Sequence, residues 1–291
     1  MIILVGAIIV ISSVAGGFLM AGGRLGTLMH LSELVIIGGA AFGAMIIMAP
    51  KKVLLDLIRQ LLNVMQGTPY KRKSYEELFM TLYELFLLGR RNGLIALEEH
   101  LTNPTSSAVF QKYPGVLRNK PAIEFICGAL RPVIDGRVKP DQLRQLLETD
   151  LDRMEEEAHA PINVLTRTAD AMPGFGIVAA VLGIVITMAS IAGPIETIGE
   201  KVAAALVGTF LGIFLGYGFM SPLAVNIEFN VLARLAYFQC ISAAVVAFAS
   251  GMAPGMAVEI ARRGLSEELR PGADELETML KALNATAAQK K

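Results

Sequence analysis

The sequence predicts an all-α integral membrane protein with four transmembrane helices and a helical cytoplasmic domain. Hydrophobic residues make up 54% of the 291 residues, and the mean hydropathy is +0.54, so the chain is more apolar than a usual soluble domain. The apolar residues gather in runs long enough to cross a bilayer, which needs roughly 20 residues in a helix. Most of the basic residues lie outside these runs, so composition and charge pattern both favour a membrane protein.

Four apolar runs account for the predicted spans. The first lacks a basic leader region and a cleavage-site pattern, so we interpret it as a span and not as a signal peptide. The second is short and is expected to extend through Glu33 or Ala49. The four predicted spans are Ile2–Ala21, Leu34–Met48, Ala171–Ala192 and Val202–Ala224.

Charge predicts the orientation of these spans. Of the 26 Lys and Arg residues, 17 lie between Pro50 and Arg167 and seven follow Pro222. The two short loops between paired spans contain only Arg24 and Lys201. Because basic segments stay on the cytoplasmic side, we expect the long middle segment and both termini inside and the two loops outside.

The predicted organisation has four parts. Residues 1–49 form a first transmembrane hairpin, residues 50–169 a cytoplasmic helical domain, residues 170–224 a second hairpin, and residues 225–291 C-terminal cytoplasmic helices with a tail. The tail after Asn284 lacks core residues and is expected to be disordered. The stretch Leu235–Met256 is apolar enough for a fifth span, but a fifth span would place the C-terminal basic residues outside. We therefore favour a cytoplasmic helix packed on the middle segment.

Helix signals divide the middle segment. Apolar residues recur at helical spacing, and glycines and prolines mark the boundaries. The last turns of the third predicted helix, Asp152 to Glu157, are too polar to be buried. The predicted helices run from a capping box at Ser74 and Glu77 to Gly93, from Pro121 to Gly136, and from Pro140 to Pro161, with a short helix around Leu97–Glu99 that ends at Asn103.

The sequence gives little support for an enzyme. It has no β pattern, no glycine-rich nucleotide loop and no catalytic Ser/His/Asp or Cys/His set. Metal, cofactor and nucleic-acid binding are not expected. Cys127 and Cys240 are predicted to be reduced packing residues. The three histidines, His30, His100 and His159, have no metal-ligand spacing.

The last two spans are glycine-rich and their interiors contain no charged residue. Gly208, Gly212 and Gly216 are four residues apart, so they share one face of a helix. Such a face lets another helix approach backbone to backbone, as helices do in lipid. If the protein moves ions, the charged group that binds them should therefore come from a partner chain.

Several separated motifs, in this order, resemble the MotA family, the membrane subunits of the bacterial flagellar stator within the larger MotA/TolQ/ExbB group. The resemblance covers nearly the whole chain. The motifs that carry it are Glu33–Ala40 (ELVIIGGA), Arg90–Glu98, Met172–Ala180 (MPGFGIVAA), Val207–Ile213 (VGTFLGI), Tyr217–Ala224 (YGFMSPLA) and Ala253–Glu259 (APGMAVE).

The resemblance implies a location, an assembly and partners. Members form a ring of five copies in the inner membrane, around the single spans of two MotB chains. MotB is anchored to peptidoglycan and carries an Asp in its span, and ion passage through that Asp drives rotation of the ring. The cytoplasmic domain engages FliG on the rotor. No cofactor is implied beyond the transported ion.

The resemblance also assigns roles in the ion pathway. Pro173 and Pro222 are expected near the partner Asp and the cytoplasmic gate, although prolines also occur ordinarily at helix ends. Thr209 is expected to face the partner Asp; the alternative is a hydroxyl bonded to its own helix. Sodium-driven relatives carry a Thr at the position of Ala180, so Ala180 favours protons, whereas Thr187 on the same face offers an oxygen.

Two further sets of residues are predicted. Arg90, Arg91 and Glu98 match the rotor-contacting positions of the family; the alternative is a solvated charge pair worth at most about 1 kcal/mol. Four glycines are predicted to pack helices together, against MotB or against a neighbouring copy. These are Gly176, Gly208, Gly212 and Gly216.

Three alternatives to a flagellar stator are considered. An ExbB- or TolQ-like energiser of outer-membrane processes shares the glycine-rich pair but typically has three spans, and the first hairpin with Arg24 favours the stator. A stator of a gliding or swarming motor belongs to the same family. A membrane scaffold that conducts nothing is a different class.

Overall fold

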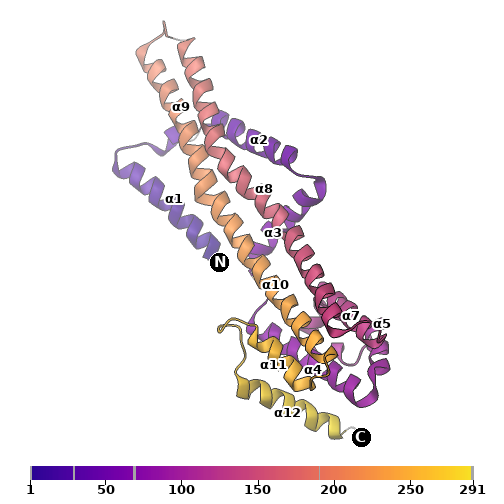
Figure 1. Ribbon diagram of the computed structural model, residues 1–291. Coiled ribbons are helices and arrows are strands. Elements are labelled where there is room, and N and C mark those ends of the chain that lie inside the picture. Colours follow the sequence, from indigo (N-terminus) through magenta and orange to yellow (C-terminus); the bar gives the residue numbers. More distant parts are fainter. Residues whose placement is uncertain (1, 29, 68–69, 190, 290–291) are drawn as a thin grey trace. The chain divides into compact units, whose positions relative to one another are not determined.

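The protein is helical throughout the residues that its computed structural model describes, which are 2–28, 30–67, 70–189 and 191–289 (Figure 1). These residues form two compact units, each built from two segments of the chain. Unit 1 contains Met1–Gly67 and Glu157–Asn230, and unit 2 contains Thr68–Glu156 and Val231–Lys291.

The helices distribute between the units as follows. Unit 1 contains α1 (Ile2–Met20), α2 (Leu31–Met48), α3 (Lys51–Gln66) and α9 (Ile195–Leu215). Unit 2 contains α4 (Arg72–Asn92), α5 (Glu98–Thr102), α6 (Pro114–Arg118), α7 (Lys120–Ile134), α11 (Pro254–Arg263) and α12 (Ala273–Gln289). The long helices α8 (Pro140–Met188) and α10 (Ser221–Ala249) contribute residues to both units.

Four helical stretches among the described residues are long and apolar enough to cross a membrane, as the sequence predicts. They are Ile2–Met20, Leu25–Met48, Pro140–Met188 and Ile195–Ala249. The bounds differ from the prediction, since α2 begins at Leu31 and the third span ends at Met188. Leu235–Ala249 continues the fourth stretch without forming a separate helix.

Unit 1 holds a small apolar core between three of its helices. Ile37 and Ala41 of α2 pack with Met172 and Ala179 of α8 and with Val207 of α9. By contrast, none of the described residues of α1 is buried. The apolar side chains of α1 therefore remain available to lipid or to another subunit.

Three prolines that the sequence places near helix ends lie within continuous helical structure. Pro161 and Pro173 lie inside α8, and Pro222 is the second residue of α10, directly after a π-helical turn at Gly216–Met220. The predicted end at Pro161 is therefore wrong. Ile162 and Leu165, which follow it, are buried, and such packing outweighs the hydrogen bond that a proline removes.

Unit 2 is organised around an aromatic and aliphatic core. The predicted apolar face of α4 is buried, with Leu78, Leu82, Leu85 and Phe86 fully covered. The ring of Phe86 stacks on Phe248 of α10, with centroids 4.4 Å apart. The apolar stretch that begins at Leu235 thus packs on the middle segment, as expected.

Helix ends in unit 2 follow the sequence signals in part. Gly93 and Gly136 have positive φ angles of 86° and 64°, the conformation that favours glycine after a helix. The predicted capping box is wrong, because α4 begins two residues before Ser74 and its N-cap is Lys71. In the tail, α12 continues to Gln289 where disorder is expected, since alanine-rich segments readily form helix. Residues 290–291 lie outside the described residues.

The two cysteines are free and buried in the core of unit 2, as the sequence predicts. Burial raises the pKa of the Cys127 thiol to about 11, so this thiol stays protonated and unreactive at neutral pH.

A charged clasp holds the C-terminal part of unit 2 together. Arg262 is buried and donates two hydrogen bonds to the Glu259 carboxylate, of 2.7 and 2.8 Å. It donates a third, of 2.9 Å, to the carbonyl of Pro271 just before α12, and Arg263 also donates to Glu259. The hydrogen bonds from Arg262 and Arg263 lower the pKa of Glu259 to about 2. The clasp therefore fixes α11 to the segment that leads into α12.

This clasp predicts a pH-dependent contribution to stability. Glu259→Gln should lower the free energy of unfolding by about 2 kcal/mol at pH 7, because Arg262 then loses its charged partner. Because the pKa of Glu259 is lower in the folded state, the contribution is complete above about pH 4.5 and disappears as the pH falls through about 2. The thermal midpoints of wild type and variant should therefore converge over that range. Glu268→Gln, an exposed position in the turn at residues 267–269 after α11, is the control and should behave as wild type at every pH.

Candidate functional site

The second membrane hairpin of unit 1 is held together by a seam of small residues where α8 and α9 run side by side (Figure 1). A Cβ atom added at Gly212 would lie 2.6 Å from the Met172 carbonyl oxygen and 2.9 Å from the Gly176 Cα. One added at Gly176 would lie 2.8 Å from the Gly208 carbonyl oxygen. Since real Cβ atoms do not approach this closely, the two helices touch backbone to backbone at these glycines.

The partner of this glycine face is therefore the third span of the same chain. The sequence predicts packing against MotB or a neighbouring copy, whereas Gly208, Gly212 and Gly216 all face α8. Farther along, the seam closes at Gly183, where an added Cβ would lie 2.7 Å from the Ala205 Cβ. Any partner chain must consequently bind another face of the hairpin.

The prolines are part of the same seam. Pro173 has no N–H, so the Ala169 carbonyl lacks its usual donor in α8. An added Cβ at Gly216 would lie 2.7 Å from this carbonyl oxygen, so glycine leaves the room that it occupies. Gly216 also begins the π-helical turn that precedes Pro222, where the Ser221 N–H donates to the Gly216 carbonyl. Pro222 has no N–H to donate, and the wider π-helical turn before it accommodates this missing hydrogen bond. The chain therefore stays helical from α9 into α10.

The threonines of the hairpin differ in their hydrogen bonding. The buried Thr187 donates its hydroxyl to the Gly183 carbonyl at 2.8 Å, so it is bonded back to its own helix. The Thr209 hydroxyl has no hydrogen-bond partner among the described residues, and the residue is half-buried. Its backbone lies on the seam, 3.2 Å from a Cβ added at Gly176. Of these two threonines, Thr209 is the one whose hydroxyl is free to contact a ligand or a partner.

Ala180 lies on the seam opposite Gly208, the residue that precedes Thr209. Its backbone nitrogen is 3.4 Å from a Cβ added at Gly208, and the side chain is half-buried. The methyl group offers no oxygen ligand, so a cation that enters here meets none from this position. The interiors of α8 and α9 at residues 171–188 and 202–215 contain no charged side chain.

In unit 2, the predicted rotor-contacting residues lie at one turn. Arg90 and Arg91 lie in the last turn of α4, Glu98 begins α5, and all three are exposed. Arg90 Nη1 donates a hydrogen bond of 3.3 Å to the Gly251 carbonyl, which restrains one of the two arginines. Between the charges, the side chain of Ile95 is 77% exposed.

The fold adds neighbours to Glu98 that the sequence does not reveal. Arg131 of α7 and Asp135, which directly follows that helix, line a recess of about 300 Å³ together with Glu98. Glu98 lies more than 30 positions before Arg131 and Asp135 in the chain, so only the tertiary structure brings it beside them. Ile95 was likewise missed, because sequence alone predicts that an isolated isoleucine is buried.

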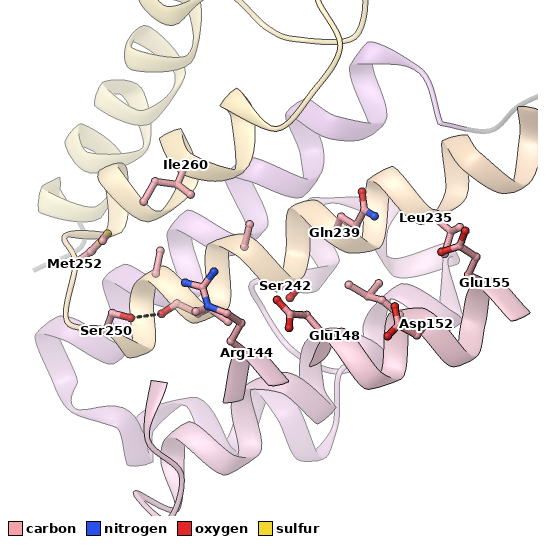
Figure 2. Close-up of a pocket in the computed structure, with 14 residues that line it drawn as sticks. Arg144, Glu148, Asp152, Glu155, Leu235, Gln239, Ser242, Ser250, Met252 and Ile260 are labelled. Atoms are coloured by element: carbon pink, nitrogen blue, oxygen red, sulfur yellow. Dashed lines mark hydrogen bonds between the residues drawn. The ribbon is translucent and has the colours of Figure 1, made fainter. Parts of the chain in front are cut away.

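A second recess in unit 2 lies between α8, α10 and α11 and measures about 380 Å³ (Figure 2). Glu148, Asp152 and Glu155 of α8 line one wall, while Gln239 and Ser242 come from α10. Asp152 and Glu155 are exposed, which confirms that these turns are not buried. Within the described ranges, no group of three or more His, Cys, Asp or Glu side chains could hold a metal ion.

Comparison with known proteins identifies full-length relatives. Residues 4–93 match the family Motility protein A N-terminal, and residues 118–236 match the MotA/TolQ/ExbB proton channel family. The chain is 37% identical to Motility protein A of Salmonella typhimurium and 36% identical to that of Escherichia coli, in both cases over 97% of this chain and 96% of the relative. It is also 36% identical to Chemotaxis protein LafT of Vibrio parahaemolyticus, over 94% of this chain and 96% of that protein.

Solved structures share the fold. The structure of C. jejuni MotAB aligns with a TM-score of 0.75 at 22% identity, covering 93% of this chain and 98% of the other. The flagellar MotAB stator complex from Bacillus subtilis aligns with a TM-score of 0.72 at 22% identity, covering 94% of this chain and 98% of the other.

The seam predicts that substitution at Gly212 is not tolerated. Gly212→Ala places a methyl group against backbone atoms that cannot move aside, so we expect the free energy of unfolding to fall by about 1–3 kcal/mol. The measurement is the thermal unfolding midpoint of the purified full chain. The control is Gly174→Ala, since no atom lies within 4 Å of a Cβ at that glycine of α8. Equal midpoints for the two variants would contradict backbone contact at the seam.

Proposed function

Since the chain belongs to the Motility protein A (MotA) family, we propose that it couples proton flow through a complex with a MotB-like chain to torque on the rotor protein FliG. Family membership makes the chain a multi-pass membrane subunit of the flagellar stator. The match of residues 4–93 to the Motility protein A N-terminal family favours the stator over an ExbB- or TolQ-like energiser. The family is one of motility proteins and not of enzymes.

The observation that carries the proposed mechanism is the combination of an uncharged seam and a free Thr209 hydroxyl. The interiors of the third and fourth spans contain no charged side chain, so this hairpin supplies no group of its own to bind the proton. We assign that role to a carboxylate in the single span of the MotB-like partner. The partner helix lies against the hairpin on the side of Thr209, and Thr209 and nearby water hydrogen-bond the carboxylate.

The energy of each step is small. One elementary charge that crosses about 100 mV releases about 2.3 kcal/mol, which suffices to shift a two-state packing arrangement but not to unfold a helix. Protonation of the partner carboxylate removes a charge from the interface with the hairpin and weakens its attraction to Thr209. Five copies of the chain form a ring around two MotB-like spans, and this ring then rotates by one step around those spans. Pro173 and Pro222, with the π-helical turn between α9 and α10, give the hairpin the places where it bends.

Protons are the proposed ions. Sodium requires oxygen ligands to replace its hydration shell, whereas a proton needs a carboxylate and a chain of water molecules. Ala180 provides no side-chain oxygen. Thr187 lies on the same face and its hydroxyl is held against its own helix by the hydrogen bond that it donates to the Gly183 carbonyl, so the choice of protons depends on Ala180.

The proposed torque surface is the turn between α4 and α5. We place it in the cytoplasm together with both termini, in agreement with the distribution of basic residues. Arg90, Arg91 and Glu98 are exposed there and available for opposite charges on FliG. Surface charges of this kind steer and orient a partner more than they bind it tightly, which suits a contact that must be made and released.

Charge reversal tests this assignment. Arg90→Glu and Glu98→Lys should each reduce swimming speed, because each places a like charge opposite the rotor. Proton conduction by the complex should stay unchanged, since neither residue lies in the spans. The measurements are the rotation rate of tethered cells and the acidification of cells that express the complex. Arg118→Glu, an exposed basic position elsewhere in unit 2, is the control and should swim normally. Equal loss of conduction and rotation would contradict the surface role.

A further inference from the structure

Helix α3 carries an apolar stripe that no described residue covers. Leu55, Ile58, Leu62 and Met65 are 46%, 54%, 59% and 51% exposed. They are spaced by three, four and three residues, so they lie on one face of the helix. A different face, with Leu57 and Val64, is buried within the chain. The helix is therefore fixed on one side and apolar on another.

The position of α3 places this stripe at a membrane surface. The second span ends at Met48 and α3 begins at Lys51, so only two residues separate them. A segment that directly follows a transmembrane helix starts at the boundary of the bilayer. Lys51, Lys52 and Arg59 make α3 too polar to be a span, and it is not among the four candidate spans of the described chain.

Charge supports lipid as the occupant of the stripe. Lys51 shares the side of the stripe, and Lys52 and Arg59 border it, each with its side chain exposed. Lys52 pairs with Glu157 and Arg59 with Asp56, at 3.3 and 3.0 Å, but both basic side chains remain more than 70% exposed. Cations beside an apolar stripe match the headgroup layer, where phosphates lie directly above the acyl chains.

The buried side of α3 connects the stripe to the third span. Gln60 donates a hydrogen bond of 3.1 Å from Nε2 to the Ala158 carbonyl of α8, and the pair of Lys52 with Glu157 lies one residue away in α8. We propose that α3 lies in the plane of the bilayer surface, with its stripe against acyl chains and its basic residues against lipid phosphates. It thereby anchors the segment of α8 at Glu157 and Ala158 to that surface.

Fluorescence quenching of the full chain in lipid vesicles tests this proposal. Single cysteines are introduced by Leu62→Cys in the stripe or by Asn63→Cys, an exposed position about 100° around the helix. Each variant is labelled with an environment-sensitive fluorophore. The native cysteines are buried, so labelling selects the introduced site. We expect blue-shifted emission and about twofold stronger quenching by phospholipids with spin-labelled acyl chains in the Leu62→Cys variant.

Other outcomes would overturn the proposal. Stronger quenching of the Leu62→Cys label by aqueous iodide would show that water covers the stripe. Protection from both quenchers would show that a second copy or another protein covers it. Met65→Cys, again with Asn63→Cys as its control, provides a second stripe position on the last turn of α3 if the Leu62→Cys variant does not fold; Asn63 lies about 160° from Met65 around the helix.

The basic residues are tested in the same assay. In vesicles that contain phosphatidylglycerol, the label of the Leu62→Cys variant should lie deeper in the bilayer than in vesicles of phosphatidylcholine alone. Quenching by the spin-labelled acyl chains should therefore be stronger. Lys51→Gln combined with Arg59→Gln should remove this difference. A difference that persists in the double variant would contradict contact between these side chains and lipid phosphates.

Discussion

The backbone contact between the third and fourth spans is the constraint on which the rest of the hairpin depends. At Gly176, Gly212 and Gly216 the two helices leave no room for a side chain. In a bilayer there is no hydrophobic driving force between apolar helices, because lipid tails are as apolar as the side chains. Close van der Waals contact between the backbones must therefore supply the attraction. A hairpin fixed in this way is a rigid element, and it leaves its remaining faces free for a partner helix and for other copies.

This constraint also explains the unusual backbone next to the seam. The carbonyl that Pro173 leaves without a donor points at Gly216, where no Cβ interferes. The chain then changes to a π-helical turn before Pro222. A rigid seam that ends at a locally irregular turn allows bending at one place while the rest of the hairpin keeps its packing. Such an arrangement suits a protein that converts ion passage into repeated small movements.

Sequence reasoning succeeded where the signal is local. The four spans follow from runs of apolar residues, the buried face of α4 from the spacing of Leu78, Leu82 and Leu85, and its end from Gly93. The periodicity of Gly208, Gly212 and Gly216 likewise predicted a bare face. It did not identify the helix that fills this face, because spacing within one helix contains no information about its neighbour.

Most errors have this same origin. Pro161 ordinarily signals a helix end, but the helix continues where packing around Ile162 and Leu165 supports it. Ser74 has the pattern of a cap, yet α4 starts two residues earlier. Arg131 and Asp135 come to lie beside Glu98 only through the packing of α5 on α7. Each case depends on contacts between residues distant in the chain, which a single sequence does not show.

The proposed mechanism makes this chain the wall of an ion pathway whose proton-binding group belongs to the partner, because the interiors of the third and fourth spans contain no charged side chain. It is tested most directly by proton flux into sodium-free lipid vesicles that contain the purified chain alone or the chain together with a MotB-like partner. We expect no flux above that of empty vesicles for the chain alone, and flux with the partner that disappears when the carboxylate in the partner's span is replaced by an amide. Proton flux through vesicles that contain this chain alone would show that the chain has a proton-binding group of its own, and would rule out the proposed mechanism.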